Sequence, residues 1–362
     1  MNVPYLDLSV KDVALKARLM EAVGTVLDHG RVIMGPEMLE LETRVAAYCG
    51  RRFCIGVSSG SDALYVALRA LDVGPGDEII TTPMSWVATT NAIVLTGATP
   101  VYVDIAPDLN IDPGRVEAAI SSKTRAIVPV HYTGKLCEMD DLVHVAEERG
   151  IPIIEDAAQA FGAEDGKGRR AGSFGHLACF SFNSMKVFHS YGEAGAVLTD
   201  DEELVDRVQS LRYAGTRNRE DCHYPSLNFR MQTLQAALLL VELDRLDQII
   251  DRRREIARTY RRSLDGLVTC PEEPDGWKHV FYTFTIQSDS RDELQRHLQS
   301  DQIETKIHHS LLMPHQTAYR GKFPLDIPVA EKTVRRILSI PNHEKMTDGQ
   351  IDHVKQSVSR FF

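Results

Sequence analysis

The chain has 362 residues, of which 43% are hydrophobic and 25% are charged, a mixture typical of a globular protein large enough for two domains. Its formal net charge of −10 argues against nucleic acid as a partner, because binding to a phosphate backbone requires a basic surface. No apolar run approaches the roughly 20 residues that span a bilayer, so a membrane partner is not expected either.

The six cysteines are scattered along the chain, and no Cys-x-x-Cys or His/Cys ligand spacing occurs. We therefore expect free thiols and no bound metal. The N-terminal stretch MNVPYLDLSVKDVALKARL lacks the apolar core of a signal peptide and carries acidic residues early. A reducing, cytoplasmic location is the expectation.

Short apolar runs alternate with helical patterns between residues 55 and 200. Asp112 is the expected N-cap of one helix, and Gly150 is expected to end another. The alternation predicts a mostly parallel sheet with helices on both faces. Strands are predicted at 78–83, 99–105, 124–132 and 151–156, and helices at 87–97, 112–120 and 138–150.

The stretch CFSFNSMKVFHSYGEAGAVLTD, residues 179–200, predicts two strands joined by a polar loop. The first strand ends at Phe182, and the second follows Gly195. The loop between them contains one lysine, Lys186. A solvated turn lysine is the simplest interpretation, and a functional amine is the alternative.

The last third of the chain begins with a long helical pattern. Residues 231–264 contain no Gly or Pro and predict one continuous helix that connects two domains. A strand is then predicted at 280–287, a helix at 291–301 and a second strand at 303–309.

These patterns predict three parts. Residues 21–250 are expected to form a large α/β domain. Residues 251–362 are expected to form a small α+β domain, and residues 1–20 an N-terminal segment that packs on it.

The stretch GVSSGSDALYVALRAL, residues 56–71, predicts a strand end, a small polar turn and an apolar helix. A helix that begins in such a turn leaves backbone N–H groups free, and glycine lets a ligand approach them closely. Gly60 and Ser61 are therefore candidates for binding a phosphate. An ordinary helix cap explains the same residues.

The stretch IPIIEDAAQAFGA, residues 151–163, predicts a buried strand that ends in two acids. Ligands of open α/β sheets bind beyond the carboxyl ends of the strands. Asp156 at that end would be costly to bury without a cationic partner, such as a protonated pyridine nitrogen. Gln159 follows three residues later and is placed to reach a neighbouring ring substituent. The alternative for Asp156 is a helix cap.

Trp86 lies in TTPMSWVATTNAI, residues 81–93, between a predicted strand and a predicted helix. An indole at this position is suited to cover the face of a flat cofactor, although a packed core tryptophan is as good an interpretation. With the phosphate held near Gly60 and a ring nitrogen held by Asp156, Lys186 is placed to reach the aldehyde of pyridoxal 5'-phosphate. Its amine would then form the Schiff base and act as the general base.

The order of these motifs, together with FSFNSMK and NFRMQTLQAA, resembles the DegT/StrS family of pyridoxal-phosphate-dependent sugar aminotransferases. The resemblance extends over nearly the whole chain, from YLDL at residue 5 to SIPNH at residue 339. It implies an α/β protein with the fold-type-I aminotransferase architecture. The large domain would contain a mostly parallel mixed sheet flanked by helices, and the C-terminal domain would be a small α+β unit.

The resemblance also implies a role for individual residues. Lys186 corresponds to the lysine that forms the Schiff base with the cofactor. Arg230 corresponds to a residue that binds the carboxylate of the amino donor, and His308, or alternatively His309, to a histidine near the substrate. The cofactor-binding residues would be Gly60, Ser61, Trp86, Asp156, Gln159, Ser181, Lys186 and Asn228, with Asn228 reaching the phosphate of a neighbouring subunit.

The activity implied is the transfer of an amino group from glutamate, through pyridoxamine 5'-phosphate, to a nucleotide-linked 3- or 4-keto hexose. Two alternatives stay open, a keto-inositol aminotransferase that uses glutamine and a sugar dehydratase. Family members that dehydrate carry histidine at the lysine position, so Lys186 disfavours the second. The partners expected are a keto-sugar substrate, an amino-acid donor and a second copy of the chain in a homodimer with shared active sites. FNSMK and VHYTGK depart from the usual family motifs, which leaves the sugar unidentified.

Overall fold

A computed structural model describes all 362 residues of the chain. The helices are α1 (Val13–His29), α2 (Pro36–Cys49), α3 (Gly60–Ala70), α4 (Ala88–Leu95), α5 (Pro113–Ala119), α6 (Met139–Arg149), α7 (Glu202–Arg212), α8 (Thr233–Leu243), α9 (Leu246–Leu264), α10 (Arg291–Ser300), α11 (Pro328–Thr333) and α12 (Asp348–Phe361). The strands are β1 (Phe53–Val57), β2 (Glu78–Thr81), β3 (Thr99–Tyr102), β4 (Thr124–Val128), β5 (Ile154–Asp156), β6 (Leu177–Ser181), β7 (Gly195–Thr199), β8 (Thr216–Arg217), β9 (Asp221–Cys222), β10 (Phe284–Gln287) and β11 (Ile337–Ile340).

The central sheet consists of two segments that continue into one another. One segment has the strand order β1-β7-β6-β5 and the other the order β3-β2-β4. Parallel bridges from Ile127 to Ile153 and from Val130 to Asp156 join β4 to β5. Only β7 runs antiparallel to its neighbours, β1 and β6. The prediction of a mostly parallel mixed sheet flanked by helices is confirmed.

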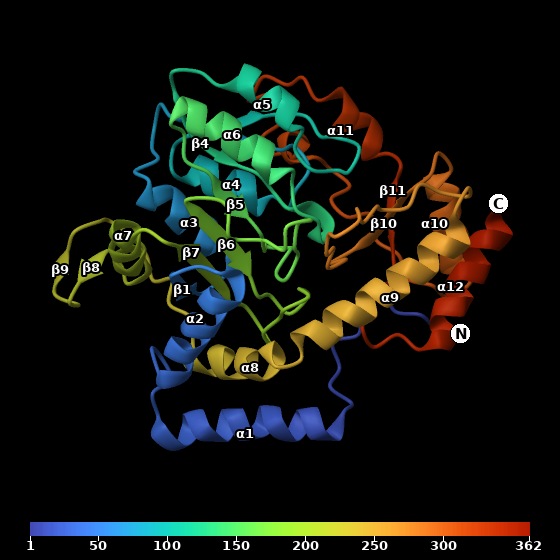
Figure 1. Cartoon of the computed structure of the whole chain (residues 1–362), viewed down its shortest axis with the longest axis horizontal. Helices are drawn as coiled ribbons and strands as arrows, with labels where there is room; N and C mark the ends of the chain where they lie inside the picture. Colours follow the sequence, from blue (N-terminus) through green and yellow to red (C-terminus); the bar gives the residue numbers. More distant parts are fainter.

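Helices cover both faces of this sheet (Figure 1). On one face, α3, α4 and α7 bury an apolar cluster that includes Leu64 and Val208. On the other face, α2 and α8 pack on the side chains of β6 and β7 that point that way, with Leu239 and Phe180 in one core. Successive strand residues point to opposite faces, so the strands supply both cores at once.

The stretch 231–264 forms two helices, α8 and α9, that meet at Asp244 and Arg245. The prediction of one continuous helix was wrong because no Gly or Pro marks the break. Asp244 at the junction pairs with two distant arginines, Arg18 at 2.6 Å and Arg44 at 2.7 Å. After the junction, α9 runs away from the central sheet toward the C-terminal part of the chain (Figure 1).

The predicted strand at 303–309 is not formed as a continuous element. Ile303 makes a single bridge to Val3, and Lys306 makes one to Ser339. Gln302 and His309 at the two ends have left-handed backbone, with φ of 60° and 58°. The segment therefore contributes single bridges to two different partners, and the prediction of a strand was wrong.

The C-terminal part is built on the antiparallel pair β10–β11, beside which α9, α10 and α12 lie. Tyr260, Phe284 and Val354 belong to one buried cluster there, and Val3 of the N-terminal segment joins it. In contrast, Leu15 of α1 packs against α8. The domain boundaries at residues 20 and 250 stay a prediction.

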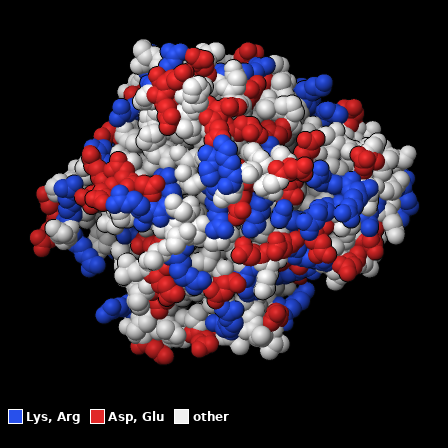
Figure 2. Space-filling view, in the orientation of Figure 1, with Lys and Arg blue, Asp and Glu red and all other residues white.

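Basic and acidic side chains are interspersed over the face drawn in Figure 2. The arginines of α9 contribute part of the basic surface, and several of them pair with acids, as Arg254 does with Glu273 at 2.8 Å. No helix in the chain is both long enough and apolar enough to cross a membrane.

Candidate active site

A cavity of about 580 Å³ lies beyond the carboxyl ends of β1, β2, β5 and β6. This volume falls in the range of typical small-molecule sites, and the position is the one that open α/β sheets use for ligands. Eight of the residues singled out from the sequence line this cavity: Gly60, Ser61, Trp86, Asp156, Gln159, Ser181, Lys186 and His308.

The start of α3 faces the cavity. Ser59 caps the helix by accepting a hydrogen bond from the N–H of Asp62, while the N–H groups of Gly60 and Ser61 have no acceptor within the chain. A Cβ atom on Gly60 would lie 2.5 Å from the Cβ atom of Ser181, so only glycine fits there. The free N–H groups, the helix dipole and the hydroxyl of Ser181 together suit an anion such as a phosphate.

Asp156 ends β5 with only 3% of its surface exposed. Its carboxylate accepts a hydrogen bond from the Thr89 hydroxyl at 2.8 Å and a weaker one from the Ala158 N–H at 3.3 Å. Burial raises the pKa of Asp156 above its ordinary value. A protonated ring nitrogen in the cavity would offset that burial, so the residue fits the proposed pyridine partner.

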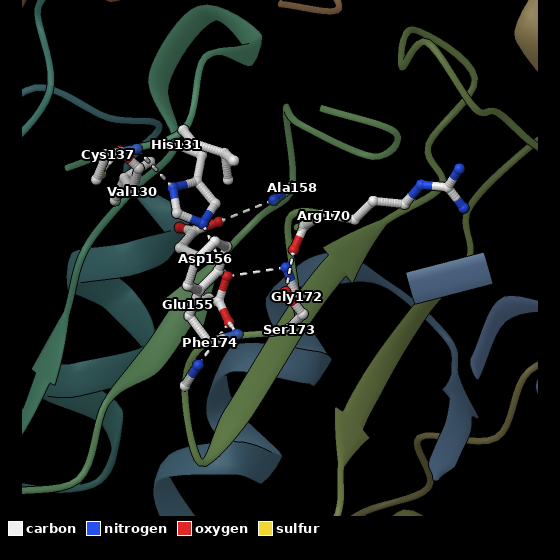
Figure 3. A network of polar contacts seen from close by, with 12 residues as sticks. Val130, His131, Cys137, Glu155, Asp156, Ala158, Arg170, Gly172, Ser173 and Phe174 are labelled. Atoms are coloured by element: carbon white, nitrogen blue, oxygen red, sulfur yellow. Dashed lines mark hydrogen bonds and ion pairs between the residues drawn. The ribbon is translucent and has the colours of Figure 1, made fainter. Parts of the chain in front are cut away.

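Glu155, the residue before Asp156, is fully buried in a network of hydrogen bonds (Figure 3). It accepts one from His131 Nε2 at 3.0 Å, while His131 Nδ1 accepts one from the Cys137 N–H at 3.1 Å. Burial alone would raise the pKa of Glu155, but these hydrogen bonds outweigh it and lower the pKa. Three backbone N–H groups complete its shell: those of Gly172, Phe174 and Gly175.

Lys186 lies in the loop between β6 and β7, and its Nζ atom is 4.5 Å from the centre of the Tyr282 ring. The loop is anchored, because Phe182 and Phe188 on either side of Lys186 are buried and pack with Phe161. A freely solvated turn would have no such anchors. The lysine is therefore held at the cavity rather than in open solvent.

Gln159 and Trp86 lie on the wall of the same cavity. Gln159 Oε1 accepts a hydrogen bond from the Thr133 N–H at 3.0 Å, which leaves its amide nitrogen free to donate. Trp86 is 60% exposed, and its nearest aromatic partner is the His309 ring, with the two ring centres 5.8 Å apart and the planes tilted by 40°. An exposed indole at a cavity wall fits a stacking role better than a core role.

His308 and His309 also line the cavity. His308 is 5% exposed and its Nδ1 atom has no hydrogen-bond partner in the chain. Nδ1 of His309 lies 3.2 Å from the Tyr132 hydroxyl, which donates to the backbone oxygen of His308. Burial lowers the pKa of both histidines, that of His309 to about 3. Both rings are therefore neutral near pH 7.

Asn228 and Arg230 do not line the cavity of their own chain. They contact each other instead: Arg230 Nε donates to Asn228 Oδ1 at 2.7 Å, and the Arg230 guanidinium lies 4.4 Å from the centre of the Tyr213 ring. The structure therefore brings eight of the ten predicted residues together and leaves these two outside.

Other residues that line the cavity were not singled out from the sequence, among them Thr89, Tyr282 and Lys306. Thr89 lies about one helical turn after Trp86, which is a weak signal that it shares the same wall. Tyr282 and Lys306 come from the C-terminal part of the chain, and only the packing of that part against the sheet brings them to the cavity. The cavity therefore contains a second lysine, Lys306, in addition to Lys186. Lys306 forms no ion pair.

The α/β fold with a cavity at the carboxyl edge of its sheet is shared with solved aminotransferase structures, one of which, a DegT DnrJ EryC1 StrS aminotransferase from Brucella abortus, has a TM-score of 0.96 and 33% identity over 99% of both chains. The chain belongs to the DegT/DnrJ/EryC1/StrS aminotransferase family, which it matches over residues 13–359.

Among the relatives of the chain are proteins named as sugar transaminases and a protein named as a regulator. The dTDP-3-amino-3,4,6-trideoxy-alpha-D-glucose transaminase of Streptomyces venezuelae is 40% identical over 94% of this chain and 91% of its own length. A protein of Geobacillus stearothermophilus named pleiotropic regulatory protein is 38% identical over 100% and 99%. Among solved structures, NtdA from Bacillus subtilis with bound cofactor PMP has a TM-score of 0.90 and 30% identity, covering 99% of this chain and 85% of that one.

Proposed function

We propose that this protein is a pyridoxal-phosphate-dependent aminotransferase that transfers an amino group from glutamate to a nucleotide-linked 3- or 4-keto hexose. The observation that carries the proposal is that Lys186, Asp156 and the start of α3 line one cavity although they are far apart in the sequence. An amine, a buried carboxylate and an anion site are the three groups that this cofactor requires.

The residues around the cavity fit the cofactor. Gly60, Ser61 and Ser181 would bind its phosphate through two backbone N–H groups and a hydroxyl. Asp156 would hold the protonated ring nitrogen, and a buried carboxylate with a raised pKa gains from such a partner. The amide nitrogen of Gln159 would donate to the 3-hydroxyl group, and the indole of Trp86 would cover one face of the ring.

The bound cofactor supplies an electron sink for the carbon that loses its proton. The protein places an amine beside that carbon: Lys186 Nζ would remove the proton and deliver it to the carbon on the other side of the intervening nitrogen, a 1,3-shift. Positioned acid–base groups of this kind contribute about 10²–10⁴-fold to a rate. The Tyr282 ring, 4.5 Å from Nζ, holds the amine on the cavity side of the loop.

The sugar class is proposed from the names of the relatives and from the chemical groups that line the cavity. A curated relative is a transaminase of a dTDP-linked sugar. The cavity is lined by hydroxyl, amide and imidazole groups, which suit a polyhydroxylated substrate. His308 or His309, both neutral, would contact the substrate.

We propose a homodimer in which Asn228 and Arg230 complete the partner's site. Both are outside their own cavity, and Asn228 is exposed. The test is to mix Lys186→Ala with Asn228→Ala, each inactive alone, under conditions in which subunits exchange. Statistical mixing should restore about a quarter of wild-type activity, since half of the dimers are mixed and each has one complete site. No recovery in verified mixed dimers would contradict shared sites.

The function is tested with a panel of keto sugars and keto-inositols, offered to enzyme that has first been loaded with pyridoxamine phosphate. Amination of a nucleotide-linked keto hexose is the expected result. Amination of a keto-inositol, with glutamine as donor, would replace the sugar proposal by the aminocyclitol alternative. Loss of water without amination would indicate a dehydratase. Specific DNA binding without turnover would favour a regulatory role, the role that the name of the Geobacillus relative describes.

A further inference from the structure

A second, smaller cavity of about 80 Å³ adjoins the cofactor cavity. The two cavities share four wall residues: Met185, Tyr282, Lys306 and His308. Its remaining walls come from the N-terminal segment at Tyr5, from α9 at Arg253 and from the residues after β11 at Asn342. It therefore lies where three distant parts of the chain meet beside the Lys186 loop.

Three buried side chains on its wall have polar atoms without a partner in the chain. Asn342 is 5% exposed, and neither its amide oxygen nor its amide nitrogen is hydrogen-bonded. The Nε atom of Arg253, a residue 3% exposed, and the Nδ1 atom of His308 are also unpaired. Buried polar groups are almost always hydrogen-bonded, so three of them around one small cavity indicate a ligand group that bonds to them.

The charge and the hydrogen-bonding capacity of the wall define that group. Arg253 donates from Nη1 to the backbone oxygen of Asn342 at 2.9 Å and pairs through Nη2 with Glu344 at 3.1 Å, which leaves Nε as a free donor. Lys306 is cationic and forms no ion pair. Free donors therefore exceed free acceptors, and one positive charge is not balanced. A carboxylate, small and rich in acceptor oxygens, is the complementary group.

We propose that this small cavity binds the side-chain carboxylate of the amino donor, an inference that rests on the proposed aminotransferase function. Lys186 Nζ is 4.5 Å from the centre of the Tyr282 ring, and the same ring forms a wall of the small cavity. A donor whose amino group lies at Lys186 would extend its carboxylate past Tyr282 to Asn342 and Arg253. Asn342 is the residue that determines donor specificity.

A carboxylate on the sugar is the other source of the same chemistry. The two sources are separated by measuring each half of the reaction on its own.

The first test measures binding without turnover. Glutarate, which has the two carboxylates of glutamate but no amine, is titrated into the cofactor-loaded enzyme by calorimetry. Asn342→Asp, which places a like charge at the site, should weaken glutarate binding at least ten-fold, and Asn342→Leu should weaken it similarly by removing the donor. Gln302→Glu, which adds the same charge at an exposed position outside the small cavity, should change the affinity less than two-fold. Wild-type affinity in the Leu variant, or in a folded Asp variant, would overturn the proposal.

The second test compares the two halves of the reaction by cofactor absorbance. Asn342→Asp should convert the cofactor more slowly with glutamate, and the ratio of glutamine to glutamate rates should rise at least ten-fold, because a carboxylate accepts from a carboxamide and repels a carboxylate. Its reaction with the keto sugar, starting from enzyme loaded with pyridoxamine phosphate, should match the wild type. A loss confined to the sugar half would overturn the donor assignment. If wild-type enzyme binds glutarate but aminates no keto sugar, the proposed function fails and the carboxylate site stands.

Discussion

Glu155 and Asp156 are consecutive residues of β5, and their carboxylates have opposite electrostatic surroundings (Figure 3). Glu155 accepts hydrogen bonds from His131 and from three backbone N–H groups, which lower its pKa. Asp156 accepts only from Thr89 and Ala158, and burial raises its pKa. One carboxylate is satisfied by the fold, whereas the other is left for a cationic group in the cavity.

Asp156→Asn should stabilise the cofactor-free protein at neutral pH. Because its folded pKa is raised, the folded state binds the proton more tightly than the unfolded state. The wild type should therefore lose stability as pH rises from about 4, the ordinary aspartate value, through the raised folded pKa. Chemical denaturation at several pH values should show the variant more stable above this window and equal to the wild type below it. A variant that is less stable at pH 7 would contradict the assignment.

Glu155→Gln should have the opposite effect. The folded pKa of Glu155 is lowered, so its stabilisation is present above the ordinary glutamate value of about 4.3 and is lost as pH falls through the folded pKa. Replacing the carboxylate leaves buried donors without a full partner, at a cost of about 1–3 kcal/mol at pH 7. Urea denaturation measures this cost. A neutral or stabilising effect at pH 7 would show that the network does not hold a charged Glu155.

Gly60→Ala should weaken cofactor binding strongly. The new Cβ atom would collide with the Cβ atom of Ser181 and displace the start of α3 from the phosphate position. Gly24→Ala is the matched control, because a Cβ at Gly24 in α1 meets nothing within 4 Å. That change should raise stability by about 0.5–1 kcal/mol, since alanine favours a helix interior over glycine. Fluorescence titration with the cofactor compares the two. Equal cofactor affinities of the two variants would show that the start of α3 does not bind the phosphate.

Trp86→Ala should reduce cofactor affinity without lowering the stability of the cofactor-free protein. The side chain is 60% exposed, so its removal costs little packing. Loss of one aromatic stack is worth about 0.5–1.5 kcal/mol, or roughly two- to twelve-fold in affinity. Trp86→Phe keeps a ring and should recover most of this loss. A drop in the thermal midpoint of the cofactor-free variant, with unchanged cofactor affinity, would instead assign Trp86 a packing role.

Local patterns predicted the central sheet and much of the site. The parallel β-α-β order follows from periodicity, and Asp112 caps α5 as expected by accepting a hydrogen bond from the Gly114 N–H. The candidates Gly60 and Asp156 lie at strand ends, and the topology of a parallel sheet collects strand ends at one edge.

The remainder depends on contacts between distant residues. The break between α8 and α9 falls at Asp244, which pairs with the distant Arg18 and Arg44, and no local pattern reveals these contacts. Tyr282 and Lys306 reach the cavity only because the C-terminal part packs against the sheet. Asn228 and Arg230 lie outside the cavity of a single chain, so their roles depend on a second copy.

Lys186 is the lysine proposed to form the covalent bond with the cofactor, and the cavity contains one competing lysine, Lys306. Reduction of the cofactor-loaded enzyme with borohydride, followed by proteolysis and mass spectrometry, identifies the modified lysine. We expect the cofactor on the peptide that contains Lys186, and loss of both the modification and the visible absorbance in Lys186→Ala. Modification of Lys306, or retained visible absorbance in Lys186→Ala, would contradict this proposal.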